Sequence, residues 1–178
     1  MPGIWRKLRG PAWVLFIMMI LGGCHGMKRF NVVVTADQSI SDRTVEIDLV
    51  GVNRYDLQRW NSMELSKYWT RGNPERENAS KYTIKFGVSE QGEPLPSEQI
   101  LKKNHDIWKE WRDNRVTHLF VLAHLPGLHE DRPGSADNRR VSVPLEKECW
   151  GWFAGKIEIK VNYSNVNCIT LPPKCPIE

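Results

Sequence analysis

Two histidines and a short acidic run are the residues of this chain whose types and spacing could support metal or acid–base chemistry. His118 and His124 occur in one apolar run, and their even spacing would place both on the same face of a regular strand. His129-Glu130-Asp131 follows in the next polar segment. Imidazole and carboxylate groups are common zinc ligands and general acids or bases. Two histidines that end a strand before a solvated loop give the same pattern, so we favour a structural role for them over a metal-dependent hydrolase.

Recognisable catalytic motifs are missing around these residues. The sequence has no G-x-S-x-G, no H-E-x-x-H, no phosphate-binding glycine loop and no cysteine spacing typical of zinc. We therefore expect no metal, no cofactor and no enzymatic activity. A different binding function could come from Gly151 between Trp150 and Trp152, because aromatic faces stack on sugars, although such side chains more often fill a core. A protein that binds carbohydrate or peptidoglycan is thus a second alternative.

The sulfur of Cys24 is the other group with definable chemistry. Three basic residues (Arg6, Lys7 and Arg9) precede the apolar run Ala12–Leu21, as in an export signal. The run is about half of the ~20 residues that a membrane-spanning helix needs. Leu21-Gly22-Gly23-Cys24 resembles the lipobox of bacterial lipoproteins. The resemblance implies that the sulfur takes a diacylglyceryl group and that cleavage leaves Cys24 as an acylated N-terminus.

These features predict a signal peptide over residues 1–23 and one mature domain over residues 24–178 that is anchored in the lipid bilayer through acylated Cys24. Two or three acyl chains hold a protein on a membrane, whereas a single chain binds only marginally. His25, rather than an aspartate, follows the cysteine. In this respect the chain resembles lipoproteins that an enterobacterial sorting rule delivers to the outer membrane, where they face the periplasm. The alternative is an ordinary secretory signal with a chance cysteine near its end.

The charge of the mature chain excludes one class of partner. Removal of residues 1–23 takes away three of the 25 basic residues and none of the 21 acidic ones. The mature chain is therefore close to neutral, and we expect no nucleic-acid partner. In an oxidising compartment, the three remaining cysteines predict one disulfide and one free thiol. The sequence leaves two pairings open, Cys149 with Cys168 or Cys168 with Cys175.

Apolar periodicity predicts a mainly β protein with short helices. In the segment 44–52, Val45, Ile47 and Leu49 alternate with Glu46 and Asp48, as in a strand with one face buried. Helical spacing predicts one broken or two short helices over 56–69 and a helix over 97–114, which Ser97 would cap, while 71–80 reads as a loop. Strands are expected at 30–35, 44–52, 82–88, 117–125, 141–145 and 156–163. This order predicts a transthyretin- or immunoglobulin-like β-sandwich with inserted short helices.

The layout from the lipobox onward resembles the outer-membrane lipoproteins of type VI secretion systems, the TssJ-like family. The shared features are an alternating strand that runs into helices with aromatic positions (Tyr55–Trp69), a central apolar strand (Leu119–Leu125) and closing strands (Val141–Leu145 and Ile157–Leu171). The resemblance implies a non-catalytic adaptor in an envelope complex. It also implies that the loop between the first two strands, Ala36–Arg43, contacts the periplasmic part of an inner-membrane protein.

Loops on a rigid sandwich can vary without disturbing the core, so we expect loops to make the partner contact. Asp37, Gln38 and Asp42 are our first candidates for this contact. The polar loop Gly127–Arg140 is the second candidate.

Overall fold

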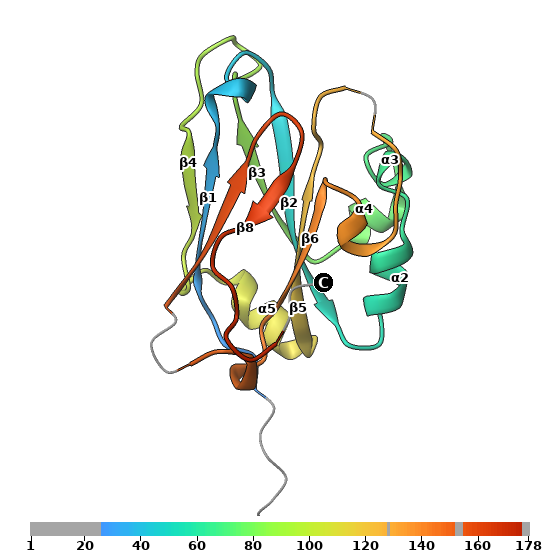
Figure 1. Ribbon diagram of the computed structural model, residues 1–178, viewed down its shortest axis with the longest axis vertical. Helices are drawn as coiled ribbons and strands as arrows, with labels where there is room; N and C mark the ends of the chain where they lie inside the picture. Colours follow the sequence, from blue (N-terminus) through green and yellow to red (C-terminus); the bar gives the residue numbers. More distant parts are fainter. Residues whose placement is uncertain (1–25, 128, 152–154, 176–178) are drawn as a thin grey trace, which may run out of the picture.

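Two four-stranded β-sheets face each other in the computed structural model, which describes residues 26–127, 129–151 and 155–175 (Figure 1). The strand orders are β4-β1-β7-β8 and β3-β2-β5-β6. Neighbouring strands are antiparallel except β1 and β7, which are parallel. The expected class, a mainly β transthyretin- or immunoglobulin-like sandwich with inserted short helices, is confirmed. The strands are β1 (Asn31–Ala36), β2 (Val45–Asn53), β3 (Lys81–Phe86), β4 (Glu98–Leu101), β5 (Val116–Ala123), β6 (Arg140–Pro144), β7 (Lys156–Val161) and β8 (Val166–Cys168).

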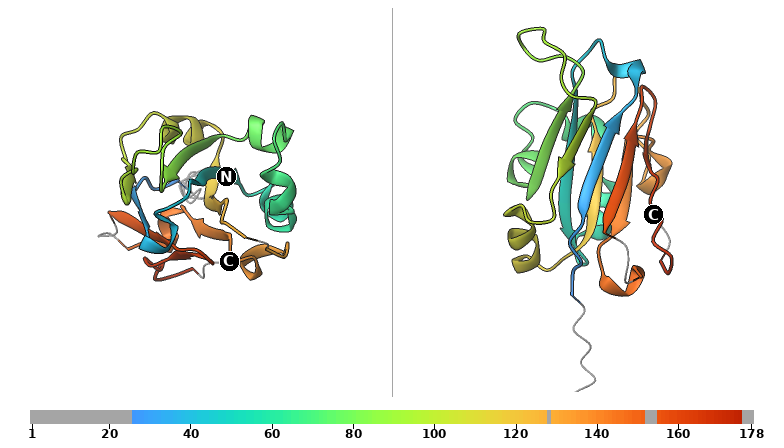
Figure 2. Two further views of the ribbon diagram at one scale, coloured as in Figure 1. Left: turned by 90° about the horizontal axis from the view of Figure 1, so that it is seen from above. Right: turned by 90° about the vertical axis from the view of Figure 1, so that its left-hand side faces the viewer.

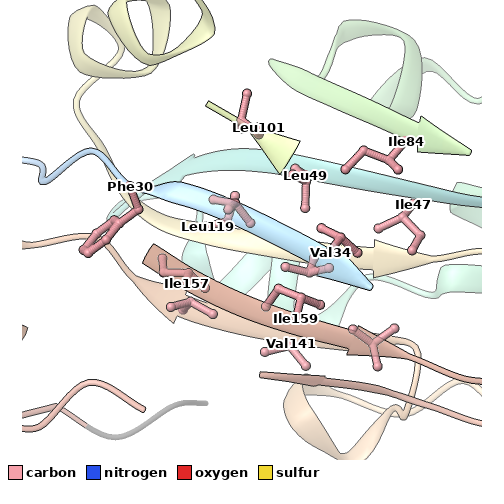
Figure 3. Packing of buried hydrophobic residues seen from close by; sticks show 14 of the residues in the cluster. Phe30, Val34, Ile47, Leu49, Ile84, Leu101, Leu119, Val141, Ile157 and Ile159 are labelled. Carbon is pink, nitrogen blue, oxygen red and sulfur yellow. The ribbon is translucent and has the colours of Figure 1, made fainter. Parts of the chain in front are cut away.

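The core between the sheets is built from apolar side chains that alternate along the strands. Val34 of β1, Ile47 of β2 and Ile159 of β7 point into this space, and each is at most 1% exposed (Figure 3). The side chains of β7 that alternate with them, such as Lys160, face solvent. This alternation confirms the half-buried character that the sequence predicts for the segment 156–163.

Short helices cover the outer face of the second sheet, as seen from above in Figure 2. Val50 and Phe120 on that face pack against Trp60, Leu65 and Tyr68 from the helices and form a second apolar cluster. The expectation of two short helices within 56–69 is confirmed, whereas the segment 71–80, expected to be a loop, contains one more. The helices are α2 (Leu57–Ser62), α3 (Leu65–Tyr68), α4 (Pro74–Asn78) and α5 (Ile107–Asp113), with 3-10 turns η1 (Gln38–Ile40), η2 (Gly134–Ala136) and η3 (Lys147–Cys149).

The predicted helix over 97–114 is wrong in its first half. Glu98–Leu101 forms β4 and pairs with β1, and the helix α5 begins only at Ile107. Apolar Ile100 and Leu101 fit either a helical face or a strand, and pairing with β1 decides between the two. As a result, Leu101 is buried in the core while Ile100 is 42% exposed. β4 and β8 are the two strands that the sequence pattern did not predict.

Both predicted disulfide pairings are wrong, because the structure joins Cys149 to Cys175. The segment after β8 folds back along η3, and the backbone N–H of Lys174 donates to the carbonyl of Cys149 at 3.3 Å. This path brings the two Cα atoms to 5.1 Å, within the range that a disulfide requires. Among the described cysteines, Cys168 is the free thiol, and burial raises its pKa to about 11.

The two ends of the sandwich differ in the loops that they carry. The chain reaches β1 at one end, here called the N-terminal end, and β1 then runs to the opposite, far end (Figures 1 and 2). The predicted signal peptide, Cys24 and Trp152 lie outside the described residues. Within the described ranges, no helix has the length and apolar character needed to cross a bilayer.

Candidate functional site

The loop between β1 and β2 is a short, well-supported protrusion at the far end of the sandwich (Figure 1). Asp37 caps η1, since its Oδ1 accepts a hydrogen bond of 3.0 Å from the Ser39 N–H. This backbone hydrogen bond is the main reason that the pKa of Asp37 lies below its usual value. Ile40 is fully buried and fixes the loop to the core, whereas Gln38 is exposed. The loop therefore presents polar side chains on a fixed backbone.

The last residues of the same loop, just before β2, form an exposed ion pair. Arg43 Nε lies 3.3 Å from Asp42 Oδ1, and the two side chains are 49% and 69% exposed. The guanidinium also lies over the ring of Tyr163, 5.7 Å from its centroid, in the turn between β7 and β8. Ser39 Oγ accepts from the Tyr163 N–H at 3.1 Å. The β1–β2 loop and the β7–β8 turn thus form one continuous surface.

The predicted contact residues therefore differ in role. Gln38 and Asp42 are exposed at the far end, where a partner could reach them. The carboxylate of Asp37 is already used to cap η1. A shallow cavity of about 110 Å³ lies beside the loop, between η1 and the segment that leads to β4. Gly87, Pro94 and Leu95 line its other side, and sequence reasoning did not assign them to this region.

Gly87 holds the loop in place through a close backbone approach. Its φ is +86°, and an added Cβ would lie 1.9 Å from the carbonyl oxygen of Arg43. We expect Gly87→Ala to cost about 1–3 kcal/mol from the unfavourable φ alone, and to displace the loop as well. Thermal unfolding of the purified protein and hydrogen exchange of the segment 37–44 would measure both effects. A variant with unchanged stability and unchanged exchange in this segment would contradict the assigned role.

In the second candidate loop, between β5 and β6, ion pairs with little exposure to solvent fix the backbone. Arg139 Nη2 lies 2.6 Å from Asp131 Oδ1 and 2.7 Å from Asp137 Oδ2. Asp131 also accepts from the backbone N–H of Ser66 at 2.9 Å. Burial alone would raise the pKa of Asp131, but the bonds from Ser66 and Arg139 lower it to about 2. This loop therefore serves to fasten α3 to the second sheet.

Arg140 is a further structural residue that the sequence pattern did not reveal. Its side chain is buried, and its guanidinium donates to the backbone carbonyls of Trp60, Asn61 and Met63 at the end of α2. Lysine and arginine side chains can satisfy the carbonyl groups that the last turn of a helix leaves free. The residue thus connects the sheet to the helical layer.

The histidines do not converge on one site. His118 lies near the start of β5, whereas His124 follows the last residue of that strand, and the six-residue spacing separates them by about 20 Å at the usual rise of a β-strand. His118 contacts Thr117, and Glu130 forms an exposed pair with Arg132. Among the described residues, no group of three or more histidine, cysteine, aspartate or glutamate side chains is arranged to hold a metal ion.

His124 instead takes part in a stack around Trp69. The imidazole lies parallel to the indole, with 5.0 Å between ring centroids, and the Arg76 guanidinium lies 4.3 Å from the Trp69 centroid. Partial burial is the main cause of the lowered pKa of His124, and the nearby charge of Arg76 adds to it. Cavities of about 280 and 460 Å³ border this stack, and both are lined by Trp69, Thr70 and His124. Sequence reasoning missed this arrangement because its members come from separate elements.

Most of the tryptophans that the structure describes are core residues. Trp150, for which a sugar platform was the alternative to a core position, is 4% exposed, packs on Phe30 and donates from Nε1 to the carbonyl of Pro144 at 2.7 Å. Trp60, Trp108 and Trp111 are buried as well. The face of Trp69 is occupied by its neighbours. Burial therefore argues against a carbohydrate platform on four of the five described tryptophans, whereas Trp69 is partly buried and borders the two cavities.

Among the comparisons with known proteins, only the one with solved structures gives matches. No protein-family model and no curated protein matches the chain. It is similar in fold to Lip of Serratia marcescens, described as a membrane-bound component of the type VI secretion system. The identity is 13%, the match covers 81% of this chain and 97% of that chain, and the TM-score is 0.44. It is also similar to the type VI secretion lipoprotein TssJ1 of Pseudomonas aeruginosa, with 9% identity, 82% and 98% coverage, and a TM-score of 0.45.

Proposed function

We propose that this chain is a lipid-anchored, non-catalytic adaptor that binds a protein partner in a bacterial cell envelope. The layout of its sequence points to a type VI secretion complex as the setting, at the periplasmic side of the outer membrane. The exposed surface formed by Gln38 and Asp42 is the contact site. Acylated Cys24 is the anchor.

The position of the β1–β2 loop is the observation that carries this proposal. The loop lies at the end of the sandwich opposite the start of β1, where the chain arrives from Cys24 (Figure 1). A protein anchored at one end and exposed at the other can hold a partner at a distance from the membrane. Gly87, Ile40 and the Asp37 cap fix the loop backbone, which limits the entropy lost when a partner binds.

The anchor can be tested at Cys24. We expect Cys24→Ser to leave an unprocessed precursor that takes up no labelled fatty acid. The physical reason is that serine lacks the sulfur that accepts the diacylglyceryl group. Cys168→Ser is the matched control, because Cys168 is the other cysteine outside the disulfide, and it should be labelled normally. Labelling of the Cys24→Ser protein would contradict the proposal.

The contact site can be tested by charge and size changes on the loop. We expect Gln38→Lys combined with Asp42→Lys to reduce capture of the partner from detergent-solubilised envelopes at least tenfold, because a few central contacts dominate most interfaces. Asp37 is left unchanged because it caps η1. The measurement is the amount of partner that copurifies, identified by mass spectrometry.

A triple alanine variant at His118, His124 and Glu130 provides the comparison. If the protein is an adaptor, this variant should capture the partner normally, provided that it is folded. The reverse outcome, in which the folded triple variant fails and the loop variant works, would favour a metal or hydrolytic site instead.

A further inference from the structure

The two ends of the sandwich carry opposite net charge. The described segments at the N-terminal end are 26–30, 54–56, 102–115, 145–151 and 169–175, and they hold ten basic and six acidic residues. The described segments at the far end are 37–44, 87–97, 124–127 and 162–165, and they hold one basic and four acidic residues. Although the mature chain is close to neutral overall, its two ends carry net charges of +4 and −3.

The folded domain begins very close to Cys24. Met27 already forms a β-bridge with Glu146, the Lys28 N–H donates to the Leu145 carbonyl at 2.7 Å, and the Gly26 carbonyl accepts from the Lys147 N–H at 3.2 Å. Three Cα–Cα steps separate Cys24 from Met27, a reach of about 11 Å at full extension. Any membrane that holds the sulfur of Cys24 must therefore lie close to the N-terminal end of the sandwich.

The basic residues of this end surround the point where the chain enters the fold. Lys147 lies next to Gly26, since its Nζ would be 3.0 Å from a Cβ added there. Lys102 and Lys103 are exposed in the turn before α5, and the Lys103 N–H donates to Asn31 Oδ1 at the start of β1. α5 and η3 both lie at this end in Figure 1. The cations thus come from separate segments and share one end of the molecule.

An exposed aromatic side chain accompanies these charges. Tyr55 is 92% exposed, in the turn between β2 and α2, and is the most exposed large apolar side chain of the described residues. Its neighbour Arg54 pairs with Glu146, which joins this turn to the segment that contacts Met27. Tyrosine is enriched at the level of lipid headgroups, where its ring is partly buried and its hydroxyl stays hydrated.

We propose that the N-terminal end of the sandwich rests on the headgroups of a bilayer that contains anionic phospholipid. This inference relies on the proposed acylation of Cys24, which brings the two surfaces together. The potential of an anionic membrane decays over a Debye length of about 10 Å at 0.1 M salt, which is similar to the reach of the linker. The anchor therefore holds Lys102, Lys103 and Lys147 within the range of that potential.

The negative charge of the far end favours the same orientation. An anionic surface repels the acidic far end while it attracts the basic one, so the long axis stands away from the membrane. Gln38 and Asp42 are then turned toward the aqueous space. The membrane contact would in this way present the partner-binding loop.

Photo-cross-linking of the processed lipoprotein in vesicles tests this arrangement. Vesicles of phosphatidylcholine alone are compared with vesicles that also contain phosphatidylglycerol, each with a trace of phospholipid that carries a photoactivatable headgroup. In the anionic vesicles, we expect several-fold more cross-links in 54–56, 102–115 and 145–151 than in 37–44 and 87–97. Salt at 1 M, where the Debye length is about 3 Å, should remove most of this preference.

Two triple variants distinguish the effect of positive charge at the N-terminal end from the effect of the net charge of the whole protein. Lys102→Glu, Lys103→Glu and Lys147→Glu together should abolish the preference. The matched control changes three exposed cations elsewhere, Lys67→Glu, Arg71→Glu and Lys160→Glu, and should keep it. Equal cross-linking of both ends in the unmodified protein would overturn the inference, as would preference for the far end or equal loss in both variants.

Mass spectrometry of the N-terminal peptide is recorded on the same samples. An acylated Cys24 together with even cross-linking overturns the orientation and leaves the anchor in place. A peptide without acyl chains overturns the anchor, and the orientation that relies on it falls as well.

Discussion

Ile159→Asp is expected to unfold the sandwich. Ile159 is 1% exposed, lies opposite Val34 and Cys168 in the first sheet, and faces the core between the sheets (Figure 3). The substitution loses about 1.5–3 kcal/mol of apolar burial and adds several kcal/mol for an unpaired buried carboxylate. Together these losses are comparable to the ~5–15 kcal/mol that stabilises a typical domain. Urea unfolding followed by near-UV circular dichroism would measure the change.

The next residue along β7 offers the matched control. Lys160 faces solvent, so Lys160→Asp introduces the same side chain into the same strand without burying it. We expect this variant to differ from the unmodified protein by less than about 1 kcal/mol, the range of β-propensity. Similar unfolding curves for the two variants would contradict the assigned core.

Asp48→Ala should detach the helical layer from the second sheet. Asp48 is fully buried and accepts hydrogen bonds from Tyr68 Oη at 2.9 Å, Arg76 Nε at 2.9 Å and Thr83 Oγ1 at 2.6 Å. Removal of one partner of a buried ion pair costs about 3–5 kcal/mol, because the remaining charge is left without compensation. Glu46 still pairs with Arg76, at 2.6 Å, so we expect the lower part of this range.

Hydrogen exchange can localise the effect of this substitution. Amide protection should fall in α2, α3 and α4 and persist in β1 and β7, which do not contact the network. Tyr68→Phe removes a single hydrogen bond from Asp48 and should cost only about 1 kcal/mol. Uniform loss of protection in Asp48→Ala, or a stability equal to that of Tyr68→Phe, would contradict the proposed role of the network.

Asp48 also illustrates where sequence-based prediction reached its limit. The alternation in β2 predicted a strand with one face in the core, and Val45, Ile47 and Leu49 are indeed buried. The same pattern placed Asp48 on a solvent face, whereas the helices cover it. The three partners that satisfy its carboxylate are 20, 28 and 35 residues away. Local periodicity contains no information on contacts of this range.

The strands that were predicted correctly have strong local patterns, and those that were missed depend on pairing. β7 alternates apolar and charged residues along its whole length, so its period identifies it. β4 has four residues and β8 three, too few to establish a period. The disulfide shows the same limit, since Cys175 reaches Cys149 only because the final segment folds back on η3.

The candidate site was predictable in part. The position of the β1–β2 loop between two recognisable strands could be read from the sequence, and Gln38 and Asp42 are exposed there. That Asp37 caps η1, and that Gly87 supports the loop from another strand end, required the fold. For the histidines, the even spacing predicted one shared strand face, but β5 ends at Ala123 and the length of the strand keeps His118 and His124 apart.

Site-specific cross-linking in living cells tests the central claim most directly, namely that the far-end loop holds a protein partner. A photo-cross-linking amino acid is placed at Gln38, at Thr70 beside the cavities, or at Gln58 on the outer surface of α2; all three positions are exposed. We predict one dominant adduct with an envelope protein from Gln38 and none from Thr70 or Gln58. An adduct from Thr70 with none from Gln38 would contradict the account.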